Sequence, residues 1–486
     1  MRKMVISIII LAVIILGIGA LFVLQKLSLP KQSLVQEPKS KNLFAANNYT
    51  DSPFGFLAQY IDSSITRPAY SAYGGFLAIQ KLYKDIGVHW DRGSGRSGGA
   101  IWGALEKNVD GYRSVFDKYV KTATDNNVNL LITISPAYSE SEGEAYLPSD
   151  LNAYAKFVEK LVSDYPLVKY WQIHNEVNGG IFWKDTPQNY AKLVRATSDA
   201  IRKNCPDCKI VLGSSINVDA SGKLQSITQY FEPVLQELNK NGKKYFDIFD
   251  YHFFAPAEYT PDSYYLALSK GIEETKNLLG KYGYGDADIW TTETMLFTTD
   301  GMKKNEIQKL PESYRSINEN QQARAVIKTY ISGLANGVKK IFWNKLTEGS
   351  WFDFMFNRAG LIRNPSFSGS DAKKLSYYTY KKMVEILEGS DWKNIQKIQE
   401  SDGVYVYKFI KNNKSIWVAW NDNPDRKQIT ISGIASAQIK LTEAVPKYET
   451  GSQVTDYNTA FNTSTKSVTG GKVAIALGDR PVFVEE

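Results

Sequence analysis

Two glutamates in this sequence stand in short motifs that could support acid–base and nucleophilic chemistry. Glu176 ends the run His174-Asn175-Glu176, and Glu293 directly follows Thr292. Two opposed carboxylates are what cleavage of a glycosidic bond requires, because one gives a proton to the leaving oxygen while the other attacks the anomeric carbon or orients water. This chemistry depends on elements that bring the two side chains face to face.

The surroundings of the two carboxylates predict different roles for them. Arg92 near Glu293 would keep that carboxylate ionised, whereas a less polar surrounding would raise the pKa of Glu176. A single glutamate of this kind would more often be an ion-pair partner at a surface. The prediction therefore depends on both residues following strands of one sheet.

Eight short runs rich in β-branched and aromatic residues are predicted to be strands, and turn residues precede most of them. The runs are Phe54–Ala58, Val88–Arg92, Leu130–Ser135, Tyr170–His174, Ile210–Gly213, Ile248–His252, Ile289–Thr292 and Lys340–Trp343. Segments with a helical period alternate with them, namely Ala72–Ile86, Tyr112–Asn126, Leu151–Ser163, Tyr190–Lys203, about Ser263–Leu279, Glu319–Ala335 and Lys374–Leu387.

Alternating strands and helices of this number predict an α/β fold, a (β/α)₈ TIM barrel over residues 52–390. A doubly wound sheet is the alternative, but it would usually carry a glycine-rich phosphate loop after its first strand, and this sequence has none there. In a barrel the chemistry lies at the carboxyl ends of the strands. Glu176 follows the fourth strand and Glu293 ends the seventh, so both would face the same mouth.

After residue 391 the helical period ends and short alternating strands follow, which predicts a C-terminal antiparallel β-sandwich over 391–486. Trp417, Trp420 and Tyr405 could form a carbohydrate-binding face there, but core packing is the favoured interpretation.

The N-terminal residues 1–25 contain Val5–Leu24, an uncharged apolar run long enough to cross a bilayer as a helix. Arg2 and Lys3 precede it, which places the short tail in the cytoplasm and the rest of the chain outside. We expect an N-terminal transmembrane helix that acts as a signal-anchor, with residues 26–51 as a flexible tether. A cleaved signal peptide, and hence a secreted protein, is the alternative. Either way the catalytic domain would be extracytoplasmic, in the periplasm or at the cell surface.

Composition excludes several other classes of partner and site. The net charge of +7 is spread along the chain without a basic block, so we expect no nucleic-acid partner. Three His residues show no metal-ligand spacing with the acidic residues, so neither a metal site nor a cofactor is expected. Cys205 and Cys208 could form a local disulfide or remain two free thiols, and both readings are structural.

The motifs together resemble clan A of the retaining glycoside hydrolases, and they are most similar to glycoside hydrolase family 39 and its neighbours. The resemblance covers roughly Phe54 to Ser390. Besides Asn175-Glu176 and Thr292-Glu293, it rests on Val88–Arg92, Asn318–Arg324, Trp343, and Gly360–Ile362 followed by Tyr377–Tyr378. It implies a retaining O-glycosyl hydrolase in which Glu176 is the general acid/base and Glu293 the nucleophile.

The same resemblance implies roles for four further residues. Asn175 would bond the 2-hydroxyl of the sugar, Arg92 would bond Glu293, Trp343 would floor the subsite at the scissile bond, and His252 matches the histidine that ends strand six.

The sequence departs from the family pattern at one aromatic position and suggests another aromatic contact. The usual His-x-Tyr reads His252-Phe253-Phe254 here, which removes a hydroxyl partner of the nucleophile, and the alternation of the strand would point Tyr251 elsewhere. Trp183, shortly after Glu176, is expected to be a stacking platform for a sugar ring, although a packed loop anchor is the alternative.

The expected function is hydrolysis of an oligo- or polysaccharide by retaining double displacement. Transglycosylation by the same residues is an alternative, and so is a non-catalytic carbohydrate-binding protein of the cell envelope. The expected partners are the carbohydrate and, through the N-terminal helix, a membrane.

Overall fold

The computed structural model describes residues 49–57, 76–95, 97–137, 145–219, 221–349, 355–364 and 372–486, which belong to one compact unit. The predicted membrane segment and nearly all of the predicted tether lie outside these residues. Among the helices that are described, none has the length and apolar character needed to cross a membrane.

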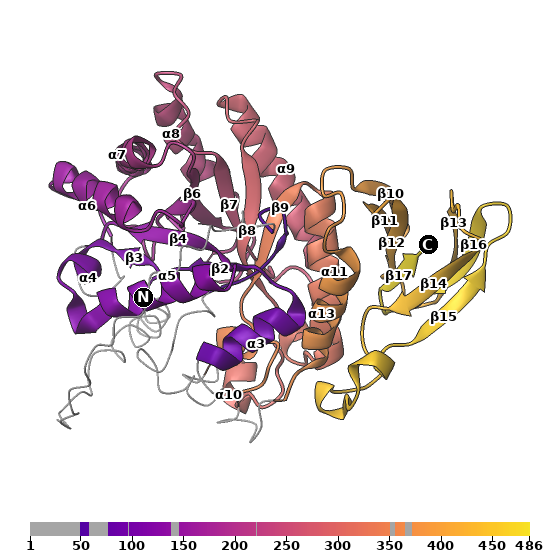
Figure 1. Cartoon of the computed structure of the whole chain (residues 1–486). Helices are drawn as coiled ribbons and strands as arrows, with labels where there is room; N and C mark the ends of the chain where they lie inside the picture. Colours follow the sequence, from indigo (N-terminus) through magenta and orange to yellow (C-terminus); the bar gives the residue numbers. More distant parts are fainter. Residues whose placement is uncertain are drawn as a thin grey trace, which may run out of the picture. The chain divides into compact units, whose positions relative to one another are not determined.

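Eight parallel strands of the described chain form a closed barrel (Figure 1). The barrel strands are β1 (Phe54–Leu57), β2 (Trp90–Gly93), β4 (Asn129–Ser135), β5 (Tyr170–Ile173), β6 (Lys209–Ile216), β7 (Ile248–Phe254), β8 (Asp288–Met295) and β9 (Val338–Trp343), with the short β3 (Ala100–Ile101) beside β4. Each barrel strand pairs with its two neighbours around the barrel. The pairing of β2 with β4, which places Trp90 opposite Asn129, closes the ring. The predicted barrel is confirmed.

Amphipathic helices follow the strands and cover the barrel. The helices are α3 (Phe76–Ile86), α4 (Trp102–Glu106), α5 (Tyr112–Asp125), α6 (Leu151–Asp164), α7 (Pro187–Asn204), α8 (Thr228–Asn239), α9 (Tyr265–Lys281), α10 (Lys304–Ile307), α11 (Glu319–Ala335) and α13 (Leu375–Leu387). Single 3₁₀ turns are η2 (Val109–Gly111), η3 (Glu312–Tyr314), η4 (Met355–Arg358), η5 (Gly451–Gln453) and η6 (Tyr457–Thr459). Side chains cap several helix starts: Asp150 accepts from Ala153 N–H at 2.9 Å, and Asn318 forms a capping box with Gln321.

The barrel interior is divided into an apolar base and a polar mouth. Residues two apart on a strand share one face, so an inward side chain is followed two residues later by another inward side chain. The base is a buried cluster that includes Trp90, Leu131, Val211, Ile248, Trp290 and Phe342. Two residues further along their strands stand Arg92, Thr133, Asp250 and Thr292, all buried. This alternation places the polar side chains at the carboxyl end of the barrel.

Two antiparallel sheets follow the barrel, drawn in orange to yellow in Figure 1. One has the order β10 (Gln396–Ser401), β11 (Val404–Lys411), β12 (Lys414–Asn421), β17 (Val482–Glu485), β14 (Gln438–Glu443) and β15 (Thr463–Ser467), and the other pairs β13 (Lys427–Ser432) with β16 (Lys472–Leu477). Trp417 packs in the core between the sheets, and Trp420 is also buried. The predicted sandwich and the core role of both tryptophans are confirmed.

Buried polar contacts join the sandwich to the barrel helices. Asp422 pairs with Lys328 of α11 at 2.6 Å and accepts a hydrogen bond from Tyr265 of α9, also at 2.6 Å. Trp420 donates its indole N–H to the same Tyr265 hydroxyl at 2.9 Å. The sandwich therefore supports the barrel from outside rather than presenting these aromatic rings to a ligand.

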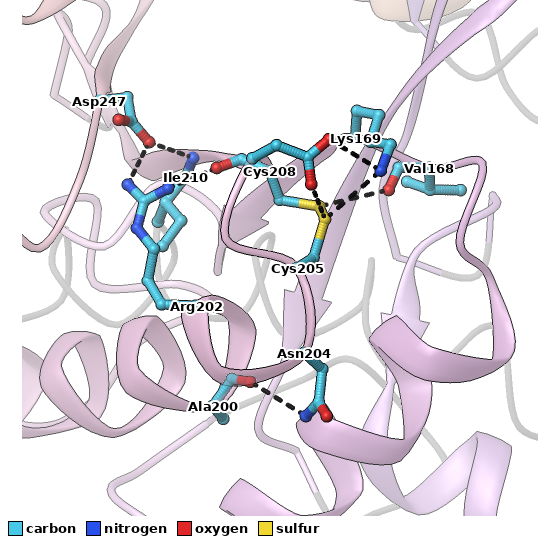
Figure 2. The surroundings of a disulfide bond; sticks show 10 residues. Val168, Lys169, Ala200, Arg202, Asn204, Cys205, Cys208, Ile210 and Asp247 are labelled. Atoms are coloured by element: carbon cyan, nitrogen blue, oxygen red, sulfur yellow. Dashed lines mark hydrogen bonds and ion pairs between the residues drawn. A yellow bond between two sulfur atoms is a disulfide. The ribbon is translucent and has the colours of Figure 1, made fainter.

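A disulfide joins Cys205 and Cys208 between the end of α7 and the start of β6 (Figure 2). Lys169 lies 3.6 Å from the sulfur of Cys205 and pairs with Asp207 at 3.0 Å. Of the two readings of this cysteine pair, the structure has the bonded one, at the amino-terminal end of the barrel strands.

Candidate active site

Glu176 is presented by an irregular turn that follows β5. His174 and Glu176 both have left-handed backbone conformations, with φ of 69° and 41°, which are unfavourable for residues with a Cβ. Hydrogen bonds hold the turn: Glu176 N–H donates to Ser214 Oγ at 2.8 Å, and Val177 N–H donates to Ser214 O at 3.1 Å. The strained turn directs Glu176 into the barrel mouth.

Glu293 lies on β8 and is held by two donors from other strands. Arg92 of β2 donates to Oε2 at 3.2 Å, and the side-chain amide of Asn344, directly after β9, donates to Oε1 at 2.9 Å. The side chains of Glu176 and Glu293 keep 11% and 13% of their surface exposed, in a site where most other polar groups are fully buried. Both predicted carboxylates are therefore accessible at one mouth.

His252, on β7, lies between the two carboxylates. Its Nδ1 is 2.9 Å from Oε1 of Glu176 and 3.6 Å from Oε2 of Glu293. Its Nε2 is 3.2 Å from Oδ2 of the buried Asp250. The ring thus connects both candidate catalytic groups to a buried anion.

Arg92 also organises Asn175. It donates to Oδ1 of Asn175 at 2.7 Å and to Oε1 of Gln172 at 2.9 Å. Ser214 Oγ donates to the same Oδ1 at 3.2 Å. These bonds fix the amide of Asn175 so that its NH₂ group, for which the described residues provide no acceptor, remains for a ligand.

The ionisation of the site follows from this network. Burial lowers the pKa of His252, but Asp250 and the hydrogen bond to Glu176 outweigh burial and raise it to about 9. His252 is therefore an imidazolium at neutral pH. Burial raises the pKa of Glu293; His252 and Arg92 lower it, and Glu176 raises it further.

The structure differs from the sequence expectation in how it surrounds the two glutamates. The carboxyl of Glu176 has a polar neighbour, because His252 Nδ1 lies 2.9 Å from its Oε1. Arg92 contacts Glu293 as predicted, yet it does not outweigh the burial that raises the pKa of that carboxylate. The two glutamates lie in one coupled cluster rather than in two contrasting environments.

His174 supports the turn that carries Glu176. Burial lowers its pKa to about 4, so the ring is neutral, and Nε2–H can donate to the backbone O of Phe182 at 3.1 Å. Trp183 packs edge-on against this ring, with centroids 5.8 Å apart, and is only 2% exposed. Trp183 is thus a loop anchor behind the Glu176 turn, and the prediction of an exposed sugar platform is not supported.

Trp343 and Phe254, two further aromatic residues at the ends of barrel strands, are also buried. Trp343 ends β9 as predicted, but it is fully buried and donates its indole N–H to Ala359 O at 3.1 Å. Its predicted sugar-stacking face is therefore not exposed in this structure. Phe254 packs against Phe356, with centroids 5.5 Å apart. Tyr251 points away toward α9, where a Cβ on Gly271 would lie within 1.9 Å of its hydroxyl, as the alternation predicts.

One ligand atom each from Glu176, His252 and Glu293 lies within 4.8 Å of the others, a spacing that a metal ion could also use. To bind a metal, His252 would have to release the proton that Asp250 and Glu176 stabilise, because metal ligation requires a neutral imidazole. The arrangement therefore fits proton transfer and nucleophilic attack better than metal binding.

Sequence reasoning missed four residues of this network: Asp250, Gln172, Ser214 and Asn344. Two of them carry a recognisable signal, because Asp250 and Gln172 stand two residues before His252 and His174 and so share their side of the strand. Ser214 carries no comparable signal. Asn344 directly follows the eighth predicted strand, which indicates its place at the barrel mouth but not its contact with Glu293.

Solved structures of glycoside hydrolases have this fold. An α-L-arabinofuranosidase from Thermotoga maritima is 12% identical over 89% of this chain and 95% of its own, with a TM-score of 0.61. A family 30 subfamily 8 xylanase from Clostridium acetobutylicum is 14% identical over 89% and 95%, with a TM-score of 0.55. A monomeric β-xylosidase from Caulobacter crescentus is 12% identical over 90% and 96%, with a TM-score of 0.53. No protein-family model and no curated protein sequence matches the chain. At these identities the likeness shows the barrel with its C-terminal sheets.

Proposed function

We propose that the protein is a retaining O-glycoside hydrolase in which Glu293 is the nucleophile and Glu176 the general acid/base. The observation that carries this proposal is the pair of carboxylates facing one mouth, with an oxygen of each within 4.8 Å of the other. Retaining enzymes place their carboxyl groups about 5–5.5 Å apart, whereas inverting enzymes need about 6.5–9.5 Å to admit a water.

The reaction then proceeds in two displacements. Glu293 attacks the anomeric carbon and forms an ester while the bond to the leaving oxygen breaks, and Glu176 gives its proton to that oxygen. Glu176 next takes a proton from water, whose oxygen attacks the anomeric carbon and releases Glu293. Arg92 binds Glu293, and the NH₂ group of Asn175 is placed to bond a sugar hydroxyl.

His252 holds the acid/base in place during both steps. Its Nδ1–H donates to Glu176, and its charge is balanced by Asp250 on the other side of the ring. Because the imidazolium keeps its proton across the neutral range, the proton that moves in catalysis is the carboxyl proton of Glu176.

The substrate class is proposed from the solved structures that share this fold. They include an arabinofuranosidase, a xylanase and a xylosidase. We therefore choose 4-nitrophenyl α-L-arabinofuranoside, 4-nitrophenyl β-D-xyloside and xylan as the first substrates to test.

Covalent trapping with a 2-deoxy-2-fluoro glycoside of the sugar that is cleaved tests the nucleophile. The wild type should gain the mass of one fluorosugar, and Glu293→Gln should gain none, while Glu306→Gln on the surface helix α10 serves as the control. Labelling of the Glu293→Gln variant would remove Glu293 from this role. Azide should restore turnover of an activated aryl glycoside to Glu176→Ala, with a glycosyl azide as product, only if Glu176 is the acid/base.

We further propose that the protein acts outside the cytoplasm on a cell-envelope polysaccharide, anchored by Val5–Leu24. The uncharged length of that segment and the preceding Arg2 and Lys3 support this. The full-length protein should fractionate with membranes, and added protease should reach the barrel from the outer side. Release of sugar from purified envelope glycans but not from xylan would support the envelope substrate, and the reverse result would contradict it.

A further inference from the structure

Asn344 contacts the candidate nucleophile from the end of β9. Its side-chain NH₂ donates to Oε1 of Glu293 at 2.9 Å, and its backbone N–H donates to Thr294 O at 2.8 Å, which fixes the residue beside β8. The side chain is 2% exposed. The opposite orientation of the amide would place its oxygen against the carboxylate, so electrostatics requires the donor to face Glu293.

The other end of the same amide has no partner. Oδ1 of Asn344 is buried and finds no hydrogen-bond donor in the part of the chain that the structure describes. A buried unsatisfied acceptor destabilises the folded state. A leucine, which has the same branched shape and the same number of side-chain heavy atoms, would avoid this destabilisation, so the presence of an amide here points to its contact with Glu293 rather than to packing.

The other residues around Glu293 do not donate a hydrogen bond to its Oε1. Arg92 faces Oε2, and His252 is 3.6 Å from the same oxygen. Position 254 is a phenylalanine packed on Phe356, so it has no hydroxyl to offer. Among the described residues Asn344 is the hydrogen-bond donor to Oε1.

We propose that Asn344 is the positioning residue of the nucleophile: its amide fixes Oε1 of Glu293 and favours the ionised carboxylate. This inference rests on the proposed function for its catalytic meaning, because Glu293 must be ionised and oriented to attack a sugar. The charged groups that face Glu293 are Arg92 of β2, Glu176 after β5, and Asp250 and His252 of β7. Burial raises the pKa of Glu293, and a donor at Oε1 acts against that rise.

The test titrates Glu293 directly by ¹³C NMR of full-length protein labelled at the glutamate carboxyl carbons. The Glu293 signal is assigned by its loss in Glu293→Gln, and a Glu176→Gln background removes the coupling between the two carboxyls. Asn344→Leu should raise the pKa of Glu293 by about one unit. A matched control is Asn421→Leu, which removes another buried asparagine, in the sandwich, and should leave this pKa unchanged.

Two further readouts separate positioning from a structural role. The melting temperature of Asn344→Leu should stay close to that of the wild type, because removal of the unsatisfied oxygen offsets the stability that is lost when the pKa of Glu293 rises, whereas that of Asn421→Leu should fall. The kcat/KM on the aryl glycoside that the wild type cleaves should fall about 10²-fold in Asn344→Leu. An unchanged pKa of Glu293 in Asn344→Leu would overturn the inference. A raised pKa of Glu293 in Asn344→Leu, combined with a wild type that shows no turnover, would instead overturn the proposed function. The contact between Asn344 and Glu293 would then remain established.

Discussion

The two ends of the barrel bury charge in opposite ways. At the mouth, Arg92, His252 and Asp250 surround two carboxylates, and each charge has a partner of opposite sign within 3.2 Å. At the base, Lys340 is buried without such a partner among the described residues. Its ammonium lies 4.2 Å from the ring centre of Trp90 and donates to the backbone oxygens of Thr50 and Ser52.

This difference separates the mouth, where the charges can take part in a reaction, from the base, where Lys340 contributes to the packing of the barrel. The mouth keeps its charges in a coupled cluster in which a proton or a negative charge can move at little cost. At the base, ring faces and backbone carbonyl groups surround the amine of Lys340. Mutations at the mouth should therefore change activity, and mutations at the base should change stability.

Glu293→Gln is expected to give the largest effect. The turnover number should fall by at least about 10⁴-fold, because the amide cannot form the covalent intermediate. Its melting temperature at pH 7 should stay level or rise: a carboxyl whose pKa is raised in the folded state loses stability as pH rises through that pKa, and the amide does not ionise. Steady-state rates and calorimetry on one preparation measure both. A large drop in melting temperature would mean that the mouth is structural after all.

Asp250→Asn should give the next largest effect. Without the anion beside Nε2, burial should bring the pKa of His252 down from about 9 to below its ordinary value, and ¹⁵N chemical shifts of the ring would follow this titration. Activity near pH 7 should fall about 10²-fold, because a neutral ring need not present Nδ1–H to Glu176. A His252 that still titrates near pH 9 in this variant would assign the shift to Glu176 instead.

The sequence predicts the backbone of this protein better than it predicts the contacts of its side chains. The barrel, seven of its helices and both glutamates follow from alternation and from the rule that catalytic residues stand at strand ends. The burial of Trp183 and Trp343 does not, because one-dimensional patterns do not show whether a ring at a strand end faces a ligand or the neighbouring loop. Asn344 was missed for a similar reason, since its contact with Glu293 depends on the register of β8 and β9.

Lys340→Met should expose a pH dependence of stability that the two ends of the barrel cancel in the wild type. Burial lowers the pKa of Lys340 to about 7, so between pH 7 and its ordinary pKa of 10.5 the folded state binds fewer protons than the unfolded state, and stability rises with pH. The raised pKa of His252 has the opposite effect on the free energy of unfolding. The stability that it contributes is complete below pH 6.5 and is lost as pH rises through 9. The two slopes nearly cancel between pH 7 and 9. In Lys340→Met the free energy of unfolding should therefore fall by up to about 1.4 kcal/mol per pH unit in this window.

Urea titrations across this pH range measure that slope. Lys339→Met, which changes the more exposed neighbouring lysine, should keep the flat profile of the wild type, and both variants should keep wild-type activity at pH 7. A flat profile in Lys340→Met would mean that Lys340 does not titrate in the folded protein between pH 7 and 9.

Replacing both cysteines, Cys205→Ser with Cys208→Ser, should give the smallest effect and confine it to the base. The disulfide closes a loop of only four residues, so its removal should cost about 2 kcal/mol of unfolding free energy on the chain-entropy estimate. The ion pair of Arg202 with Asp247, at 2.6 Å, and the bond from Ile210 N–H to the same carboxylate remain to hold α7 and β6 together. Because the strands between this end and the mouth are rigid, kcat and KM should not change. Loss of activity at full folding would show that the base positions the mouth, and the separation between the two ends would then be wrong.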